Sequence, residues 1–363
     1  MPARNLTADS SNMAIYHFNS DNGAPVCDQV MQALVDCNTG VETAYGADQW
    51  TERLNPAYSE FFEHECFVFP VPTGTAGNGL ALGAVTPSYG TIFCHRDAHA
   101  VTTECGAPEF YSGGARMTLI DGIHNKIAPE DLEQALSDHG IGNVHRMHAS
   151  TLSLTQATEA GVTYSLDELR ALNTIAHGAG MKTHVDGARF SNALVHLQAS
   201  PGEMTWKAGV DLLTYGTTKN GTMNAEAVIT FDVEIAKVLR FMHKRAGHLS
   251  SKMRYMSAQL LSNLDGDLWR INAAKANSNA SRVTDALRGC PGVEITHPVD
   301  INEIFAILPP ALMTALQDTG LNLRPWVCDK QGRGSRMVMS YCDAQDLIAR
   351  LETTCRDFAY QAR

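Results

Sequence analysis

The 363-residue sequence contains no Cys-x-x-Cys motif, no long apolar run and no excess of basic residues. No apolar run approaches the ~20 residues of a membrane-spanning helix, so the chain is not expected to cross a bilayer. Its 28 Lys and Arg are outnumbered by 39 Asp and Glu, for a net charge of −11. This balance argues against nucleic acid or anionic lipid as the main partner. We therefore expect neither nucleic acid nor a membrane among its partners.

The cysteines and the N-terminus exclude further classes. Nine cysteines, an odd number, are scattered along the chain, which is typical of reduced thiols rather than of a disulfide framework. Residues 1–13 are polar and lack an apolar core of signal-peptide length. These features predict a cytoplasmic protein.

The length is sufficient for a large core and favours division into domains. Apolar residues make up 44% and charged residues 18%, as in ordinary globular proteins. Strand-like and helix-like segments alternate up to about residue 231, a long, mostly helical tract runs from about Val233 to Leu287, and a short α/β region begins at Gly292. We predict an N-terminal arm (1–22), a large domain (23–250), and a linking helix with a small C-terminal domain (251–363).

The central stretch, residues 182–221, carries the strongest chemical signal. Two apolar runs, 181–185 and 210–215, are typical of short buried strands, each followed by a glycine. Asp186 ends the first strand, and Lys219 lies just beyond the second. Parallel strands present these ends at one edge of the sheet, where open α/β folds bind ligands. A carboxylate for a ring nitrogen and a lysine for a Schiff base are what pyridoxal phosphate requires, so we predict that cofactor.

An anion site is predicted upstream of this stretch. The apolar residues 66–71 favour a strand, and Pro72-Thr73-Gly74-Thr75-Ala76-Gly77-Asn78-Gly79 leads from it into a helix. The free N–H groups and the dipole of a helix N-terminus attract anions. Thr75 offers a hydroxyl and, we expect, the helix cap. A glycine-rich turn is a weak signal by itself.

In combination, these motifs resemble a known family. The His-Val-Asp-Gly-Ala-Arg block at 184–189 and the Gly-Thr-Thr-Lys-Asn-Gly block at 216–221 are similar to those of the low-specificity L-threonine aldolases, and residues 203–211 are most similar to the phenylserine aldolases within that group. The resemblance extends from about Phe18 to Cys342. It implies an α/β fold of the fold type I pyridoxal-phosphate class, with a mostly parallel sheet flanked by helices and a small C-terminal α/β domain.

The resemblance also implies roles at the cofactor. Lys219 would bond to the cofactor, Asp186 would contact its ring nitrogen and His99 would stack over its ring. The Pro-Thr-Gly-Thr-x-x-Asn turn matches the family's phosphate-binding turn, which makes Gly74 and Thr75 the expected phosphate ligands.

Further residues are implied at the substrate and at a subunit interface. Ser20, Arg189 and Arg336 would hold the amino-acid carboxylate, for which a guanidinium is suited because its fork meets both oxygens. Arg254 matches an arginine that reaches the phosphate of a neighbouring subunit. The chain is accordingly expected to form a homodimer or homotetramer with shared active sites.

Two further positions bear on metal binding and on the general base. His95 and His99 are four residues apart, which would suit a metal, but no third ligand accompanies them, so we expect no metal site. Thr158 stands where many threonine aldolases have a histidine that is often assigned to the β-hydroxyl of the substrate. This departure leaves the identity of the general base open.

The implied reaction is retro-aldol cleavage of an L-β-hydroxy-α-amino acid (threonine, allo-threonine or phenylserine) to glycine and an aldehyde. A β-eliminating lyase or a transaminase with the same cofactor is an alternative. A non-catalytic α/β protein that retains only the scaffold is a third hypothesis, disfavoured by the joint presence of Asp186, Lys219, Arg336 and the Gly74-Thr75 turn.

Overall fold

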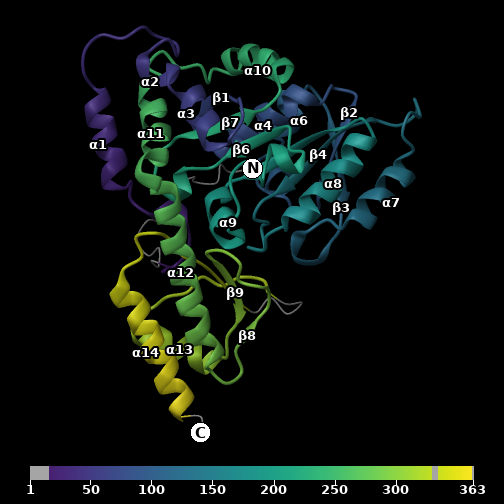
Figure 1. Cartoon of the computed structure of the whole chain (residues 1–363). Helices are drawn as coiled ribbons and strands as arrows, with labels where there is room; N and C mark the ends of the chain where they lie inside the picture. The colour runs from purple at the N-terminus through teal and green to yellow at the C-terminus, as the bar shows by residue number, and fades with distance from the viewer. Residues whose placement is uncertain (1–15, 329–333, 362–363) are drawn as a thin grey trace, which may run out of the picture.

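The computed structural model describes residues 16–328 and 334–361, so the predicted N-terminal arm lies outside the described residues up to residue 15. Within the described residues, the main sheet has seven strands in the order β1-β7-β6-β5-β4-β2-β3 (Figure 1). The strands are β1 (Phe67–Val71), β2 (Gly90–His95), β3 (Arg116–Ile120), β4 (His148–Thr155), β5 (Lys182–Gly187), β6 (Leu212–Tyr215) and β7 (Glu226–Thr230). Neighbours from β3 to β6 pair in parallel, whereas β7 is antiparallel to both β6 and β1. The predicted mostly parallel sheet is confirmed.

Helices cover both faces of this sheet, which is why β2, β6 and β7 are buried along their whole length. Leu212 and Leu213 illustrate the alternation, since they belong to different apolar clusters on opposite faces. One cluster includes side chains of α3 (Leu54–Phe61), α7 (Pro129–His139), α8 (Leu166–Gly178) and α9 (Phe190–Leu197). The other contains α4 (Gly74–Val85) and α10 (Val233–Arg245).

The remaining helices of this region are short or lie at its margin. They are α1 (Asp28–Cys37), α2 (Gln49–Glu52), α5 (His99–Thr102), α6 (Ala107–Ser112) and α11 (Arg254–Leu264). The start of α8 shows how the local sequence fixes a boundary. Ser165 Oγ accepts the Glu168 N–H at 3.2 Å, and Glu168 Oε2 accepts the Ser165 N–H at 2.7 Å, a reciprocal capping box.

A second sheet with its own core follows in the chain. It is antiparallel, in the order β10-β9-β8, and consists of β8 (Glu294–Ile295), β9 (Glu303–Ile307) and β10 (Ser335–Val338). The helices α13 (Pro310–Asp318) and α14 (Gln345–Gln361) contribute to its apolar cluster. This arrangement matches the predicted small C-terminal α/β region.

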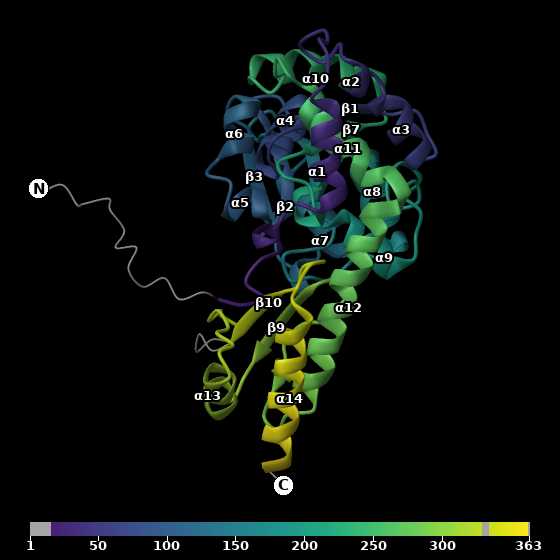
Figure 2. The same cartoon turned by 90° about the vertical axis from the view of Figure 1, so that its left-hand side faces the viewer.

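The 21-residue helix α12 (Leu268–Arg288) connects the two parts, as Figures 1 and 2 show. Its Trp269 lies in the core of the large sheet, whereas Val283 and Leu287 lie in the core of the small one. The exact domain boundaries at residues 22 and 250 stay predictions. Among the described residues, no helix has both the length and the apolar character needed to cross a membrane.

Candidate active site

The predicted acid and lysine lie at one edge of the large sheet. Asp186 is the next-to-last residue of β5 and pairs in register with Thr155 at the end of β4. Lys219 lies in η5 (Thr218–Asn220), which begins shortly after the end of β6, the neighbour of β5 on its other side. A Cβ at Gly216 would be 2.7 Å from the Cα of Ala188, so glycine permits the two strand ends to approach closely.

Asp186 is held in a fixed orientation. Its carboxylate is buried, and Oδ1 accepts the Ala188 N–H at 3.0 Å. Oδ2 accepts a hydrogen bond from Asn78 Nδ2 at 2.7 Å. Asn78 lies one turn after the start of α4, so this bond ties α4 to the end of β5.

The N-terminus of α4 is open in front of its first turn. A Cβ built on Gly74 has no atom within 4 Å, whereas one on Gly77 would be 2.6 Å from Thr214 Cγ2, because the helix packs closely on β6. Thr73, not Thr75, caps the helix, since Thr73 Oγ1 accepts the Ala76 N–H at 3.1 Å. The expected cap at Thr75 is therefore wrong, and its hydroxyl is not used for capping.

His99 begins α5 and is connected to the same network. Its Nδ1 is 2.8 Å from Glu104 Oε1, which also accepts a hydrogen bond from Asn78 Nδ2 at 2.8 Å. The hydrogen bond with Glu104, aided by the charge of Asp186, outweighs burial and raises the pKa of His99. The His99 side chain is 51% exposed, so the ring still presents a free face. His99 and Asp186 thus share one set of supports.

Lys219 differs from most charged groups of the site. Among the described residues, no carboxylate lies within ion-pair distance of its amine. Lys219 is nevertheless close enough to Asp21, His99 and Glu226 for its charge to act on all three. An amine near these groups but without an ion-pair partner is available to form a Schiff base with an aldehyde.

Glu159 was not anticipated from the sequence. Its Oε1 accepts the backbone N–H of His99 at 2.8 Å and the hydroxyl of Thr155 at 2.9 Å. Burial raises the pKa of Glu159 to about 7, even though the His99 hydrogen bond opposes the shift. Asn78 and Glu104 were missed too. The position of Asn78 in the phosphate turn was the only available signal, since nothing local marks the two glutamates.

The two arginines predicted for the substrate carboxylate are brought together by acids. Arg189 Nε and Nη2 are 2.8 and 3.0 Å from the two oxygens of Asp21. Arg189 Nη1 is 3.1 Å from Glu303 Oε2, and Arg336 Nη2 is 2.6 Å from Glu303 Oε1. Burial alone would raise the pKa of Asp21, but the charge and hydrogen bonds of Arg189, with smaller contributions from Lys219 and Asn302, hold it below its ordinary value.

Ser20 lies beside this cluster. Its Oγ accepts the Asn22 N–H at 3.2 Å and caps η2 (Asp21–Gly23), which packs against η5. Because η2 contacts η5, Ser20 lies close to the segment that carries Lys219. Its hydroxyl oxygen already accepts the Asn22 N–H.

Arg254 and Thr158 lie elsewhere. Arg254 Nη1 donates to the carbonyls of Cys37, Thr39 and Gly40, at 3.3, 3.0 and 3.4 Å, at the end of α1 of the same chain. Its contact with a neighbouring subunit's phosphate stays a prediction. Thr158 is buried, and its hydroxyl donates to the His124 carbonyl at 2.9 Å. This hydroxyl is therefore occupied by a structural bond.

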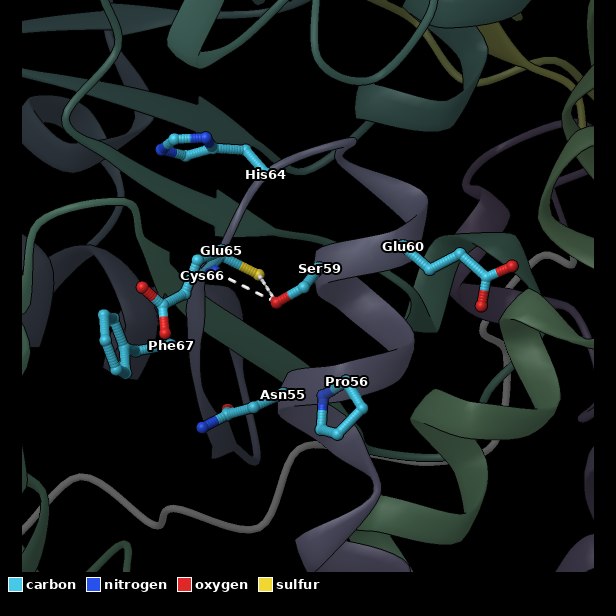
Figure 3. Close-up of a pocket in the computed structure, with 8 residues that line it drawn as sticks. All are labelled: Asn55, Pro56, Ser59, Glu60, His64, Glu65, Cys66 and Phe67. Atoms are coloured by element: carbon cyan, nitrogen blue, oxygen red, sulfur yellow. Dashed lines mark hydrogen bonds between the residues drawn. The ribbon is translucent and has the colours of Figure 1, made fainter.

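A surface groove beside α3 and β1 contains none of the predicted site residues (Figure 3). Ser59 Oγ accepts the Cys66 N–H there at 3.1 Å. Burial raises the pKa of the Cys66 thiol to about 12, so this thiol is not a reactive group. The groove offers no chemistry comparable to that of the sheet edge.

The residues at the sheet edge fit pyridoxal phosphate. Asp186 is buried and oriented for a ring nitrogen, and the open space at Gly74 suits a phosphate at a helix N-terminus. Lys219 has an amine without an ion pair among the described residues, and His99 has an exposed ring. These groups come from four segments that converge at the same sheet edge.

Comparisons with known proteins agree with this site. Residues 17–309 match the model of the beta-eliminating lyase family. The chain is 38% identical to a low-specificity L-threonine aldolase of Pseudomonas aeruginosa, covering 94% of this chain and 96% of that protein. It is 37% identical to a low-specificity L-threonine aldolase of a Pseudomonas species, covering 92% of this chain and 94% of that protein. The threonine aldolase of Leishmania major superposes with a TM-score of 0.87 at 20% identity, covering 95% of this chain and all of that one, which supports the fold.

The family match spans most of the chain, and the sheet edge carries Asp186, Lys219 and the turn at Gly74. The chain therefore belongs to the beta-eliminating lyase family, and its fold and cofactor are those of the fold type I pyridoxal-phosphate enzymes.

Proposed function

We propose that this protein is a carbon–carbon lyase that cleaves L-β-hydroxy-α-amino acids to glycine and an aldehyde. The observation that carries the proposal is the joint placement of Lys219, Asp186 and the Arg189–Arg336 pair around the C-terminal edge of one sheet. The relatives named low-specificity L-threonine aldolases, which match nearly the whole chain, support the reaction type.

The proposal assigns separate tasks to two ends of the site. One end, with Lys219 and Asp186, would hold the cofactor, and the other, with Arg189 and Arg336, would hold the substrate carboxylate. Lys219 would hold the cofactor, Asp186 would keep its ring nitrogen protonated, and Gly74 with Thr75 would bind its phosphate. Bound pyridoxal phosphate withdraws electrons from the bond at Cα that is to be broken. His99 would lie over the ring.

We propose that the other end of the site, where Arg189 and Arg336 lie, orients the substrate. Arg336, with Arg189 and Ser20 beside it, would hold the carboxylate so that the Cα–Cβ bond stands perpendicular to the ring. Orientation of this kind can lower a barrier by roughly 7–11 kcal/mol at best. The Cα–Cβ bond breaks as a base removes the β-hydroxyl proton, the aldehyde leaves, and Cα takes up a proton to give glycine.

The test is product analysis with L-threonine, L-allo-threonine and L-phenylserine. We expect glycine with acetaldehyde from the first two, and glycine with benzaldehyde from the third. The similarity of residues 203–211 to the phenylserine aldolases favours an aromatic or small aliphatic substituent at Cβ. Ammonia with a keto acid, and no glycine, would instead identify a β-eliminating lyase, and amino-group transfer would identify a transaminase.

A homo-oligomer with shared sites is part of this proposal, because Arg254 is expected to reach a neighbouring subunit. A cytoplasmic location is also proposed, supported by the absence of disulfides among the described residues. The shared-site oligomer is tested by sedimentation of the wild type and of the Arg254→Ala variant. We expect the wild type to sediment as an oligomer and the variant to bind the cofactor more weakly.

A further inference from the structure

A fully buried glutamate, Glu303, lies between Arg189 and Arg336. The Glu303 side chain has no exposed surface. Its Oε1 accepts hydrogen bonds from Arg336 Nε at 3.2 Å and Nη2 at 2.6 Å, and its Oε2 is 3.1 Å from Arg189 Nη1. Asp21 pairs with the other two nitrogens of Arg189. The four charges form a row that alternates in sign: Asp21, Arg189, Glu303, Arg336.

Exposure along this row shows from which side an anion can approach. The side chains of Asp21 and Glu303 are 1% and 0% exposed, whereas those of Arg189 and Arg336 are 12% and 22% exposed. The acids therefore lie beneath the arginines, and Arg336 is the most accessible member. All three nitrogens of Arg189 have an acid partner, whereas Arg336 Nη1 has none among the described residues.

Aromatic rings hold Arg336 in place. The guanidinium carbon lies 5.2 Å from the ring centroid of Trp326 and 5.9 Å from that of Phe305. Together with Glu303, these rings constrain the guanidinium and leave its Nη1 side for a ligand.

The charges of this row sum to zero before any substrate binds. A substrate carboxylate thus meets a neutral cluster rather than two free cations. Its attraction to Arg336 is opposed by repulsion from Glu303 on the other side of the same guanidinium. In a partly buried site this repulsion is only weakly screened by solvent.

We propose that Glu303 is a resident counter-charge that limits the affinity of this site for the carboxylate, and that Arg336 makes the direct contact. The inference rests on the proposed function and deepens it. Glycine carries the same carboxylate as the substrate, so the limit applies to product as well and favours its release. Glu303 also stabilises the empty site, because it compensates two largely buried cations.

The experiment compares the holoenzyme with its Glu303→Gln variant, with glycine as the probe. Glutamine keeps the shape and one acceptor oxygen but removes the charge. We expect the Kd for glycine, and the KM for threonine, to fall by roughly tenfold, the order expected for removing a nearby like charge at an effective dielectric constant of about 20. Without ligand the variant should unfold at a lower temperature, and glycine should raise its Tm more than that of the wild type.

The matched control is Glu294→Gln, the same chemical change at an exposed position of the adjacent strand β8. It should leave the glycine affinity and the Tm shift unchanged. An unchanged or higher Kd in Glu303→Gln would overturn the proposal, since Glu303 would then position the arginines without limiting binding.

A second measurement needs no variant and applies if Glu303→Gln does not fold. A neutral cluster gains little from the charge of a ligand, so wild-type holoenzyme should bind glycine no more than roughly tenfold more tightly than glycinamide. A preference above about 100-fold would indicate an uncompensated cationic site and overturn the proposal. If the wild type neither cleaves threonine nor binds glycine, the proposed function fails. If it does both and the charge tests fail, only this inference falls.

Discussion

At the cofactor end of the site, Asp186 is held by uncharged donors from Ala188 and Asn78, and Lys219 has no ion pair among the described residues. At the carboxylate end, Arg189 and Arg336 are already paired with buried acids. In the proposed function, the first end leaves the charges of Asp186 and Lys219 available to a cofactor that stays bound. The second end, proposed to bind a substrate that leaves after each turnover, has charges that already sum to zero.

The largest expected effect is at Lys219. Lys219→Ala should remove the visible absorbance of lysine-bound cofactor and lower kcat by roughly 10⁴-fold or more, because the covalent attachment is lost. Lys207→Ala, which removes a surface lysine paired with Glu63, serves as the control and should change neither quantity. A retained absorbance band in Lys219→Ala would contradict the assignment.

Asp186→Ala should have the next largest effect. Without the carboxylate the ring nitrogen loses the partner that keeps it protonated, so we expect kcat to fall by roughly 10²–10³-fold. Cofactor content, measured after release in alkali, should fall much less, because the phosphate turn and Lys219 remain. Equal losses of cofactor and activity would mean that Asp186 serves binding rather than chemistry.

Arg336→Ala tests the other end. Loss of a charge-assisted contact should raise KM for threonine roughly 10- to 100-fold, with a smaller change in kcat. Steady-state kinetics over a range of substrate concentrations would separate the two. Arg324→Ala removes an exposed arginine of the same region, also near Trp326, and should leave KM unaltered. Unchanged saturation kinetics in Arg336→Ala would argue against a carboxylate contact.

The smallest effect concerns pH. Glu104 raises the pKa of His99, so the stability that this pair contributes is fully present below about pH 6.5, the ordinary histidine value, and is lost as pH rises through the raised folded-state pKa. The Tm difference between wild type and Glu104→Gln should therefore favour the wild type most at about pH 6 and decline towards pH 8. The readout is this slope, and it should be modest because His99 is half exposed. Glu133→Gln, at an exposed position of α7, should show no such slope.

The cofactor end was more predictable from the sequence than the carboxylate end. Asp186 and the strand before Lys219 are marked by apolar runs and glycines, and the Ser165 capping box by its local spacing. These signals are local because backbone periodicity and capping act over a few residues. Gly74 also lies at the start of a helix, as the glycine-rich turn predicted, although the capping hydroxyl belongs to Thr73.

The partners of the charged groups could not be predicted in the same way. Asp21 and Arg189 are 168 residues apart in the chain, and no local pattern distinguishes Glu303 from a solvent-facing acid of a strand. Burial and pairing of such residues depend on how distant segments meet. For Arg254, the resemblance predicts a contact with a neighbouring subunit. The sequence did not reveal that three carbonyls of the same chain accept hydrogen bonds from its guanidinium.

The alternating row of charges has a consequence for biosynthesis. Asp21 emerges from the ribosome first, Arg189 near the middle, and Glu303 and Arg336 close to the end. A nascent chain that ends before β9 contains Asp21 and Arg189 but not Glu303, and one that ends before β10 contains Glu303 but not Arg336. The row is therefore neutral once Arg189 is made, carries an excess negative charge after Glu303, and becomes neutral again only when Arg336 is added near the end of translation.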